Sequence, residues 1–420
     1  MLTKKTFANG LRLLTIPMPW VKTVTVLVLV GVGGRYEREK TNGLTHFLEH
    51  MLFQGTEKYP NKMSLGIAVD EIGAEYNGWT DKEHTAYFIK AESKHLGRAV
   101  EVLSELVCHP RIKKEEIEAE RNVILQEIAM REDNPQVLAV DKLWETVFEG
   151  NPLGLSGTGE KKSIITFQRD NFLDFKRKFY TADNTVVVVA GNFPQNEAEE
   201  QVEKSFLSLE KGEGKSFEKF LLKQKTFRKK IIDKKTEQAH LVLGFPGFSR
   251  TSDKKYVQSL LDVILGGGFS SRLFQKIREE LRLAYYVGSE AESYLDTGIF
   301  ACFAGLDKNN VNKGLKAIWE ELERVTRSTA NVTREELRKA KDYLRGHLVL
   351  KLEEPMDVAT FYGIREVLLG KTEEPEEILS KVEKVTTEEI AEVASIIFKP
   401  EKASLVVVGE KIDKNLDLYG

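Results

Sequence analysis

The sequence predicts an α+β fold in which two homologous, layered halves follow one another along the chain. Helical segments of about 15–25 residues alternate with short strands rich in valine and isoleucine, which favours layers of helix and sheet over a helical bundle. The chain has 420 residues, more than a single hydrophobic core usually spans, so at least two domains are expected.

A repeat with a spacing of about 220 residues indicates that the two halves share one design. Residues 112–117 (IKKEEI) recur as residues 332–337 (VTREEL). Pro135 recurs at the same spacing as Pro355. The halves are joined by residues 209–221, which begin with the polar, glycine-rich run LEKGEGKS that is typical of a linker. The sequence therefore predicts two domains with these bounds: 1–208 and 222–420.

Individual elements follow from local composition. The apolar run from Val24 to Val32 is rich in β-branched side chains and predicts a strand, which is too short to span a bilayer. Residues 43–53 and 113–133 carry apolar side chains at helical spacing and predict two helices. Residues 185–190 (TVVVVA) predict a further strand, and residues 403–408 (ASLVVV) predict its counterpart in the second half.

The most informative segment is His46-Phe47-Leu48-Glu49-His50. On a helix, His46 and His50 lie about 40° apart and Glu49 falls in the same turn. Two neutral imidazoles at this spacing can bind one Zn²⁺, and the adjacent carboxylate can take a proton from water at that metal. The order His-x-x-Glu-His reverses the zincin motif. An ordinary His/Glu pair on a surface helix is the alternative, but burial of so many polar groups would cost several kcal/mol without a ligand.

A candidate third ligand lies on the helix predicted at residues 113–133. Glu120 and Glu127 are seven residues apart and therefore share one helical face. That face is otherwise apolar, which suggests that it points inward, and its apolar members are Ile117, Val123, Ile124 and Ile128. A charged, solvated face is the alternative, and it fits Glu120 better than Glu127.

These features together resemble the inverzincin metallopeptidases, the family of pitrilysin, insulysin and the mitochondrial processing peptidase. That family pairs His-x-x-Glu-His with a ligand glutamate about 75 residues downstream, and here 76 residues lie between His50 and Glu127. The flanking runs ERNVILQE at 120–127 and DNP at 133–135 also resemble the family. The resemblance implies that His46, His50 and Glu127 bind one Zn²⁺ per chain. It also implies that Glu49 is the general base, and that Glu120 orients a histidine without binding the metal.

The second half keeps the repeat but lacks the metal-binding residues. No histidine pair occurs near residues 260–265, where the metal helix should recur, and the counterpart of Glu127 at the 220-residue spacing is His347. The glycines at 266–268 are interpreted either as a helix end with a tight turn or, from the resemblance, as a mobile loop near the substrate path.

Arg278 and Tyr285 are the candidate functional residues of the second half. In the family, an arginine and a tyrosine at this spacing bind the substrate backbone and stabilise the oxyanion of the tetrahedral intermediate. Arg282 stands where the family usually has glycine, which puts the local backbone in question. The alternative is that Arg278 belongs to a charged surface run and that Tyr285 is a core residue.

Residues 74–80 resemble the family's edge strand beside the zinc helix. An unpaired strand edge can bind an extended peptide through main-chain hydrogen bonds, with little demand on its sequence. The candidate substrate-binding residues are therefore Asn77, Gly78 and Trp79, although the family commonly has alanine where Gly78 stands.

Composition limits the partners and the location. The net charge of −3 gives no electrostatic case for nucleic acid or for an anionic membrane. Cys108 and Cys302 are interpreted as reduced core residues, and no apolar leader follows Met1, so a cytoplasmic location is expected. By the resemblance, a chain of this length forms one half of a clamshell, which implies a homodimer or a heterodimer with an inactive paralogue.

The sequence therefore predicts a zinc endopeptidase that acts on peptides or unfolded protein segments. Two alternatives remain open at this point. One is a non-catalytic or regulatory peptide-binding subunit of a processing-peptidase-like heterodimer, and the other is a metal-dependent hydrolase that does not cleave peptide bonds.

Overall fold

The computed structural model describes residues 2–212, 214, 216–327 and 332–419. These residues form two compact units, each built around one β-sheet. The first unit comprises Met1–Ile128, Leu155–Glu218 and Val349–Glu373. The second unit comprises Ala129–Gly154, Lys219–Leu348 and Glu374–Gly420.

The first sheet has the strand order β1-β2-β6-β3-β5-β4. Its strands are β1 (Thr3–Thr6), β2 (Arg12–Pro17), β3 (Thr23–Val30), β4 (Glu75–Thr80), β5 (Thr85–Glu92) and β6 (Thr185–Gly191). The second sheet has the order β7-β11-β8-β10-β9. Its strands are β7 (Arg228–Asp233), β8 (Ala239–Gly247), β9 (Ala284–Ser293), β10 (Gly298–Leu306) and β11 (Ser404–Gly409).

The two sheets have the same topology. In the first, β2 runs parallel to β6, and β6, β3, β5 and β4 follow in antiparallel pairs. In the second, β7 runs parallel to β11, and β11, β8, β10 and β9 follow in antiparallel pairs. The predicted fold class, two homologous layered halves, is therefore confirmed, and β1 is an addition to the first half.

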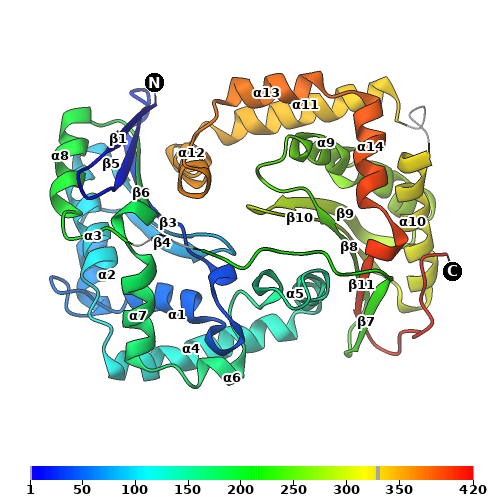
Figure 1. Ribbon diagram of the computed structural model, residues 1–420, viewed down its shortest axis with the longest axis horizontal. Helices are drawn as coiled ribbons and strands as arrows, with labels where there is room; N and C mark the ends of the chain where they lie inside the picture. Colours follow the sequence, from blue (N-terminus) through cyan, green and yellow to red (C-terminus); the bar gives the residue numbers. More distant parts are fainter. Residues whose placement is uncertain (1, 213, 215, 328–331, 420) are drawn as a thin grey trace. The chain divides into compact units, whose positions relative to one another are not determined.

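Helices cover both faces of the first sheet, which explains why its central strands are apolar on both sides. Alternate residues of β3, such as Val26 and Val28, belong to the core shared with α3 (Leu96–Cys108), which contacts β3, and α8 (Gln195–Ser205), which contacts β2. The opposite face, which includes Leu29, packs against α12 (Pro355–Leu369). Figure 1 shows α12 on one side of this sheet and α3 with α8 on the other.

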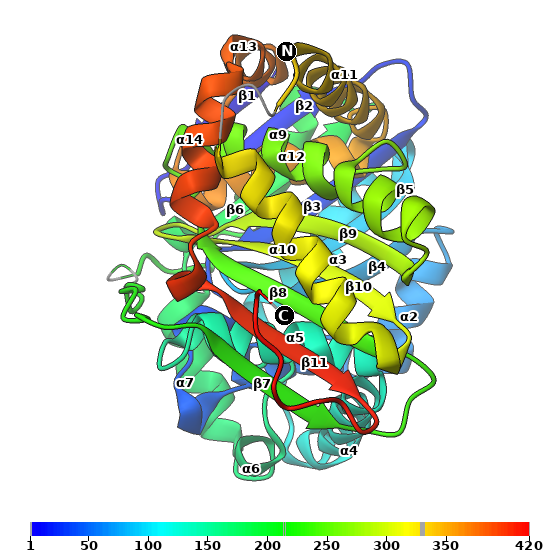
Figure 2. The same cartoon turned by 90° about the vertical axis from the view of Figure 1, so that its right-hand side faces the viewer.

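The second sheet is covered in the same way. One face packs with α9 (Lys254–Gly266), α10 (Val311–Arg327) and α14 (Thr387–Ile397), of which α10 and α14 lie in front of the sheet in Figure 2. The other face packs with α5 (Pro135–Val147) through Ala139, Leu143 and Val147. The remaining helices are α1 (Leu44–Leu52), α2 (Lys62–Asp70), α4 (Lys114–Asp133), α6 (Lys161–Ile164), α7 (Arg169–Phe179), α11 (Arg334–Lys351) and α13 (Pro375–Lys384).

Helices α5 and α12 are equivalent in the repeat, and each packs on the sheet formed mainly by the other half of the sequence. Both begin with proline, which ends the preceding helical run and starts a new one. Close packing depends on glycine: a Cβ at Gly363 would lie 2.4 Å from Leu29, and a Cβ at Gly244 would lie 2.6 Å from Leu143. The compact units do not follow the order of the sequence, because α5 belongs to the second unit and α12 to the first. The predicted division at residues 209–221 concerns the repeat in the sequence and stays a prediction.

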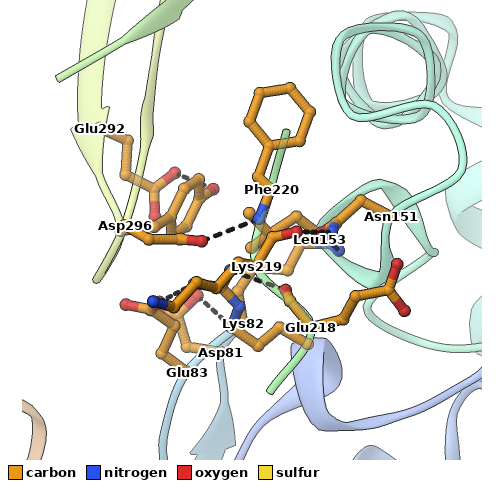
Figure 3. Close-up of polar contacts among 12 residues, drawn as sticks. Asp81, Lys82, Glu83, Asn151, Leu153, Glu218, Lys219, Phe220, Glu292 and Asp296 are labelled. Atoms are coloured by element: carbon orange, nitrogen blue, oxygen red, sulfur yellow. Dashed lines mark hydrogen bonds and ion pairs between the residues drawn. The ribbon is translucent and has the colours of Figure 1, made fainter. Parts of the chain in front are cut away.

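The predicted linker enters the second unit through main-chain anchors. The Asn151 amide donates to the carbonyl of Lys219 at 3.3 Å, and the backbone N–H of Phe220 donates to the Asp296 carboxylate at 2.8 Å (Figure 3). The Phe220 ring also packs edge-on against Phe148, with ring centroids 5.0 Å apart. The chain from Lys219 onward is therefore part of the second unit rather than a free connection.

Candidate metal centre

Helix α1 carries the histidine pair, and its first turn is fixed from outside the helix. Gly43 precedes α1 with φ of 92°, and a Cβ there would lie 2.6 Å from the Cα of Gly159, so both backbone conformation and space require glycine. Because glycine has no side chain to cap the helix, another group must do so. The buried carboxylate of Glu37 accepts hydrogen bonds from the backbone N–H groups of Gly43 at 2.8 Å and Thr45 at 2.7 Å.

The apolar face of α1 holds the helix in the core of the first unit. Phe47 is fully buried and packs edge-on against Phe172, with ring centroids 4.9 Å apart. His46 and His50 lie on the other side of the helix, where their side chains are 15% and 19% exposed. Their ring centroids are 4.7 Å apart, so both imidazoles face the same space.

Helix α4 supplies the glutamates and is locked against the same core. The guanidinium of Arg121 donates to the backbone carbonyls of Ile164 and Phe167, the latter at 2.8 Å. The predicted inward members Ile117, Ile124 and Ile128 are buried. The expectation for Val123 was wrong: it is 42% exposed, whereas the next residue, Ile124, is fully buried.

Three of the predicted residues converge on one point. Oε2 of Glu127 lies 3.5 Å from Nε2 of His46 and 3.7 Å from Nε2 of His50. Their ligand atoms all lie within 4.8 Å of one another, and no other group of this kind occurs among the described residues. Ligands about 2.0–2.1 Å from a tetrahedral zinc are about 3.4 Å apart. The three side chains therefore have the chemistry and nearly the spacing of a zinc site.

The fit to a cation is supported by Glu127 itself. Its Oε2 atom is buried, and no hydrogen-bond donor reaches it among the residues that the structure describes. A buried carboxylate oxygen without a donor is costly unless a cation occupies the space in front of it. The donor set of two imidazoles and one carboxylate is the set that zinc uses in hydrolytic enzymes.

Glu120 lies behind the histidine pair. Its Oε1 atom is 2.8 Å from Nδ1 of His50, and its Oε2 atom accepts a hydrogen bond from Gln54 at 2.8 Å. Burial alone would lower the pKa of His50, but the hydrogen bond with Glu120 and the charges of Glu127 and Glu49 outweigh burial and raise that pKa. Gln54 was missed by the sequence analysis; it lies just beyond the end of α1 at Leu52.

Glu49 is separate from the three converging atoms. Its side chain is buried, and its Oε2 atom accepts a hydrogen bond from the Thr80 hydroxyl at 2.8 Å. Burial raises the pKa of Glu49, although the hydrogen bond from Thr80 acts in the opposite direction. A Cβ at Gly78 would lie 3.1 Å from Oε1 of Glu49, so glycine leaves room for the carboxylate. Thr80 was also missed by the sequence analysis; the alternation of side chains along β4 places it on the face of Gly78.

Strand β4 lies at the edge of the first sheet and is hydrogen-bonded to β5. Asn77 is exposed, and Trp79 donates its indole N–H to Nε2 of His84 at 3.3 Å. His84 is 3% exposed and lies outside the group of candidate ligands. The candidate substrate-binding residues Asn77, Gly78 and Trp79 therefore form part of an edge strand that also contacts Glu49 through Thr80.

Arg278 and Tyr285 lie in the second unit. Arg278 belongs to a π-helix at Phe274–Glu280, with its guanidinium 5.1 Å from the ring centroid of Phe274. Tyr285 lies near the start of the edge strand β9 and is 75% exposed, which excludes the alternative of a core position. Between them, Arg282 has φ of 53°, the left-handed conformation that favours the family's glycine. Arg282 therefore adopts a conformation that glycine adopts more readily.

Comparison with known families decides the identity of the fold and the family. Residues 12–160 match the family described as insulinase (peptidase family M16), and residues 166–344 match the peptidase M16 inactive domain. The chain belongs to peptidase family M16. The family resemblance seen in the sequence is therefore confirmed, and the M16 inactive-domain match falls outside the segment that carries His46, His50 and Glu127.

Relatives of similar length carry zinc protease names. A protein of Rickettsia bellii named as an uncharacterized zinc protease is 36% identical over 403 residues, covering 95% of each chain. The uncharacterized zinc protease YmxG of Bacillus subtilis is 33% identical and covers 97% of this chain and 98% of its own. These M16 relatives support a peptidase role that involves zinc.

Solved structures share the fold. A protease from Helicobacter pylori has a TM-score of 0.89 at 24% identity, covering 97% of this chain and 99% of its own. The peptidase M16 inactive domain from Pseudomonas fluorescens has a TM-score of 0.90 at 20% identity, covering 99% of both chains. Among the described residues of this M16 chain, no helix is both long and apolar enough to cross a lipid bilayer.

Proposed function

We propose that the chain is a zinc endopeptidase that hydrolyses peptides or unfolded protein segments. The observation that carries the proposal is the convergence of His46, His50 and Glu127, with the Glu49 carboxylate held beside them by Thr80. The zinc protease names of full-length relatives support the same reading.

Each side chain is assigned one task. His46, His50 and Glu127 would hold one zinc ion, which when bound supplies a Lewis acid and a lowered pKa for water. Glu49 accepts the proton of the attacking water and delivers it to the leaving amine, as a general base and then a general acid. Glu120 accepts a hydrogen bond from Nδ1–H of His50 and so leaves Nε2 free to bind the metal.

Substrate binding is assigned to strand β4. An extended peptide would add to the open edge of β4 through main-chain hydrogen bonds at Asn77, Gly78 and Trp79. Because Glu49 is hydrogen-bonded to Thr80 on the same strand, a peptide bound there would lie next to the general base. Main-chain recognition of this kind favours unfolded segments, because most of their N–H and C=O groups are free to pair with the edge of β4.

The second unit of each chain is proposed to contribute residues to the active site of a partner subunit. Arg278 and Tyr285 of one subunit would bind the substrate backbone at the zinc site of another subunit, in a homodimer or in a heterodimer with an inactive paralogue. The proposal rests on the family resemblance. It is supported by the exposure of Tyr285 and by the left-handed backbone at Arg282, which glycine adopts readily.

The alternative function is a non-catalytic or regulatory peptide-binding subunit, which the description of residues 166–344 as an inactive domain favours. That segment contains none of the three candidate ligands, whereas residues 12–160 contain all of them together with Glu49. The ligand set is therefore the stronger observation, and it favours the enzyme.

Hydrolysis of a quenched peptide library by the purified chain tests the proposal. We expect turnover that phenanthroline abolishes and added zinc restores, with about one zinc per chain by elemental analysis. A chain that binds zinc but cleaves no peptide, alone or with its co-purified partner, would support the regulatory subunit. Zinc-dependent hydrolysis of esters without peptide cleavage would support a hydrolase of another kind.

A further inference from the structure

Glu37 is a buried carboxylate with no role in the function proposed above. It is 2% exposed, and its described partners are hydrogen-bond donors rather than a lysine or an arginine. Burial raises its pKa, and hydrogen bonds from the backbone of Gly43 and Thr45 counteract the increase. A buried carboxyl group without hydrogen-bond partners is costly, so the donors around Glu37 matter to the fold.

Two of these donors belong to the beginning of α1. The first N–H groups of a helix have no partner within the helix, and the helix dipole gives that end a partial positive charge. Glu37 accepts from Gly43 and Thr45 in this turn and from the side-chain amide of Asn42 at 3.1 Å. The Asn42 amide also donates to the carbonyl of Ser156 at 2.8 Å, which ties the cap to a neighbouring loop.

The capped turn is the turn that carries a candidate ligand. His46 is the third residue of α1, next to Thr45, whereas His50 lies one turn further along. His50 is oriented by its hydrogen bond with Glu120 on another helix. Helix ends fray where their N–H groups lose a cap, so the position of His46 depends on the first turn more than the position of His50 does.

We infer that Glu37 is a positioning residue of the metal site, which caps α1 and thereby holds His46 at zinc-binding distance from Glu127. The inference rests on the proposed zinc site. A metal ligand must be held to within about 0.5 Å of its productive place, and groups that support ligands from behind typically change metal affinity 10–100-fold.

The test compares zinc affinity in two variants of the full chain, each of which neutralises a buried carboxylate in the first unit. Glu37→Gln removes the charge of the cap and replaces one of its two accepting oxygens with an amide NH2, which cannot accept from the backbone N–H groups of Gly43 and Thr45. Glu366 lies on α12, where its Oε1 atom forms ion pairs with Arg12 at 3.0 Å and Lys4 at 2.6 Å. Glu366→Gln weakens these ion pairs and leaves the cap of α1 unchanged. Zinc affinity is measured by competition with a chromophoric chelator, and folding is checked by circular dichroism.

Both variants are expected to lower Tm, but only Glu37→Gln should weaken zinc binding, by about 10–100-fold. Unchanged zinc affinity in folded Glu37→Gln would overturn the inference and leave Glu37 as a structural cap. If Glu37→Gln does not fold, Glu37→Asp is tested instead, because aspartate keeps the carboxylate but holds it further from the backbone of α1. A several-fold loss of zinc affinity in Glu37→Asp supports the inference, and no loss overturns it.

A double-mutant cycle identifies the ligand through which Glu37 acts. In a His46→Ala background, Glu37→Gln should add little further loss of zinc affinity, whereas in a His50→Ala background it should add nearly its full effect. Equal additivity in both backgrounds would contradict action through His46. Wild-type chain that binds no zinc at all would instead overturn the proposed function, so the two failures are distinguishable.

Discussion

Nδ1 of His50 lies 2.8 Å from Oε1 of Glu120, and Nε2 of the same ring lies 3.7 Å from Oε2 of Glu127. The two glutamates come from successive parts of one helix but contact opposite sides of one imidazole. The contact with Glu120 favours the proton on Nδ1 of His50, and Nε2 then faces Glu127 and the candidate metal position. The two carboxylates should therefore behave differently when each is neutralised.

Glu127→Gln should weaken zinc binding more than Glu120→Gln does. A neutral amide is a much poorer zinc ligand than a carboxylate, whereas loss of an orienting group costs about 10–100-fold. Zinc affinity from chelator competition, measured for both variants under one set of conditions, checks the order. The reverse order would exchange the roles of the two residues.

Glu49→Gln should abolish peptide hydrolysis and leave zinc binding nearly unchanged, because it removes the proposed base and no ligand. General-base catalysis typically contributes about 10²–10⁴-fold in rate, so turnover should fall by at least that range. The measurements are kcat on a quenched peptide and zinc content of the same preparation. Near-normal turnover in the zinc-loaded variant would rule out Glu49 as the base.

Thr80→Val should lower kcat by about 10–100-fold with a smaller change in KM, because Glu49 loses its 2.8 Å hydrogen bond from the hydroxyl. Hydrogen bonds to charged groups contribute about 1.5–3 kcal/mol, which corresponds to that range. Thr80→Ser keeps the hydroxyl and serves as the matched control, with activity close to wild type. Equal activity in the valine and serine variants would show that the hydrogen bond does not position Glu49.

The histidine pair and Glu49 could be predicted from the sequence because their geometry is local to one helix. Glu127 could be assigned as a ligand only from the family spacing, because helical periodicity does not show which other helix packs against residues 113–133. Glu37 and Thr80 could not be predicted: each reaches α1 from a separate segment, and hydrogen bonds between segments leave no periodic signal.

The pairing of helices with sheets was also beyond the sequence. The repeat indicates that α5 and α12 are equivalent, but an apolar helical face is compatible with either sheet. The choice depends on surface shape, such as the space that Gly363 leaves for Leu29. The inward assignment of Val123 was wrong for a related reason, because a small shift of helical phase exposes a residue at the border of the apolar face.

Stability should depend on pH through Asp262 in the second unit. Burial raises the pKa of this carboxyl to about 6, although it accepts a hydrogen bond from Ser289 at 2.5 Å. Because the folded-state pKa lies above that of the unfolded chain, this contribution to stability is present below about pH 4 and is lost as pH rises through about 6. Its upper limit is about 3 kcal/mol.

Asp262→Asn should therefore raise Tm at pH 7.5 relative to wild type and have a smaller effect at pH 4.5. Thermal unfolding followed by circular dichroism at both values measures the difference. Glu320→Gln, which neutralises an exposed carboxylate on α10 of the same unit, is the control and should shift Tm little at either pH. A stabilisation by Asp262→Asn that is equal at both pH values would contradict the assigned titration.

The dimer proposal divides each active site between two chains, so two inactive variants should complement each other. Glu49→Gln lacks the proposed base and Arg278→Ala lacks the proposed substrate contact, and each should be nearly inactive alone. In a heterodimer of the two, one site joins an intact metal half to an intact Arg278 and Tyr285, and the other site carries both defects.

Random exchange in a 1:1 mixture makes about half of the dimers heterodimers, each with one working site of two, so activity should recover to about a quarter of wild type. Subunit exchange is verified first with differently tagged chains, and a mixture of Glu49→Gln with Glu127→Gln is the control. Those two defects lie in the same half of the site, so that mixture should stay inactive. If the first mixture also stays inactive after verified exchange, Arg278 does not serve the partner's site and the trans arrangement is wrong.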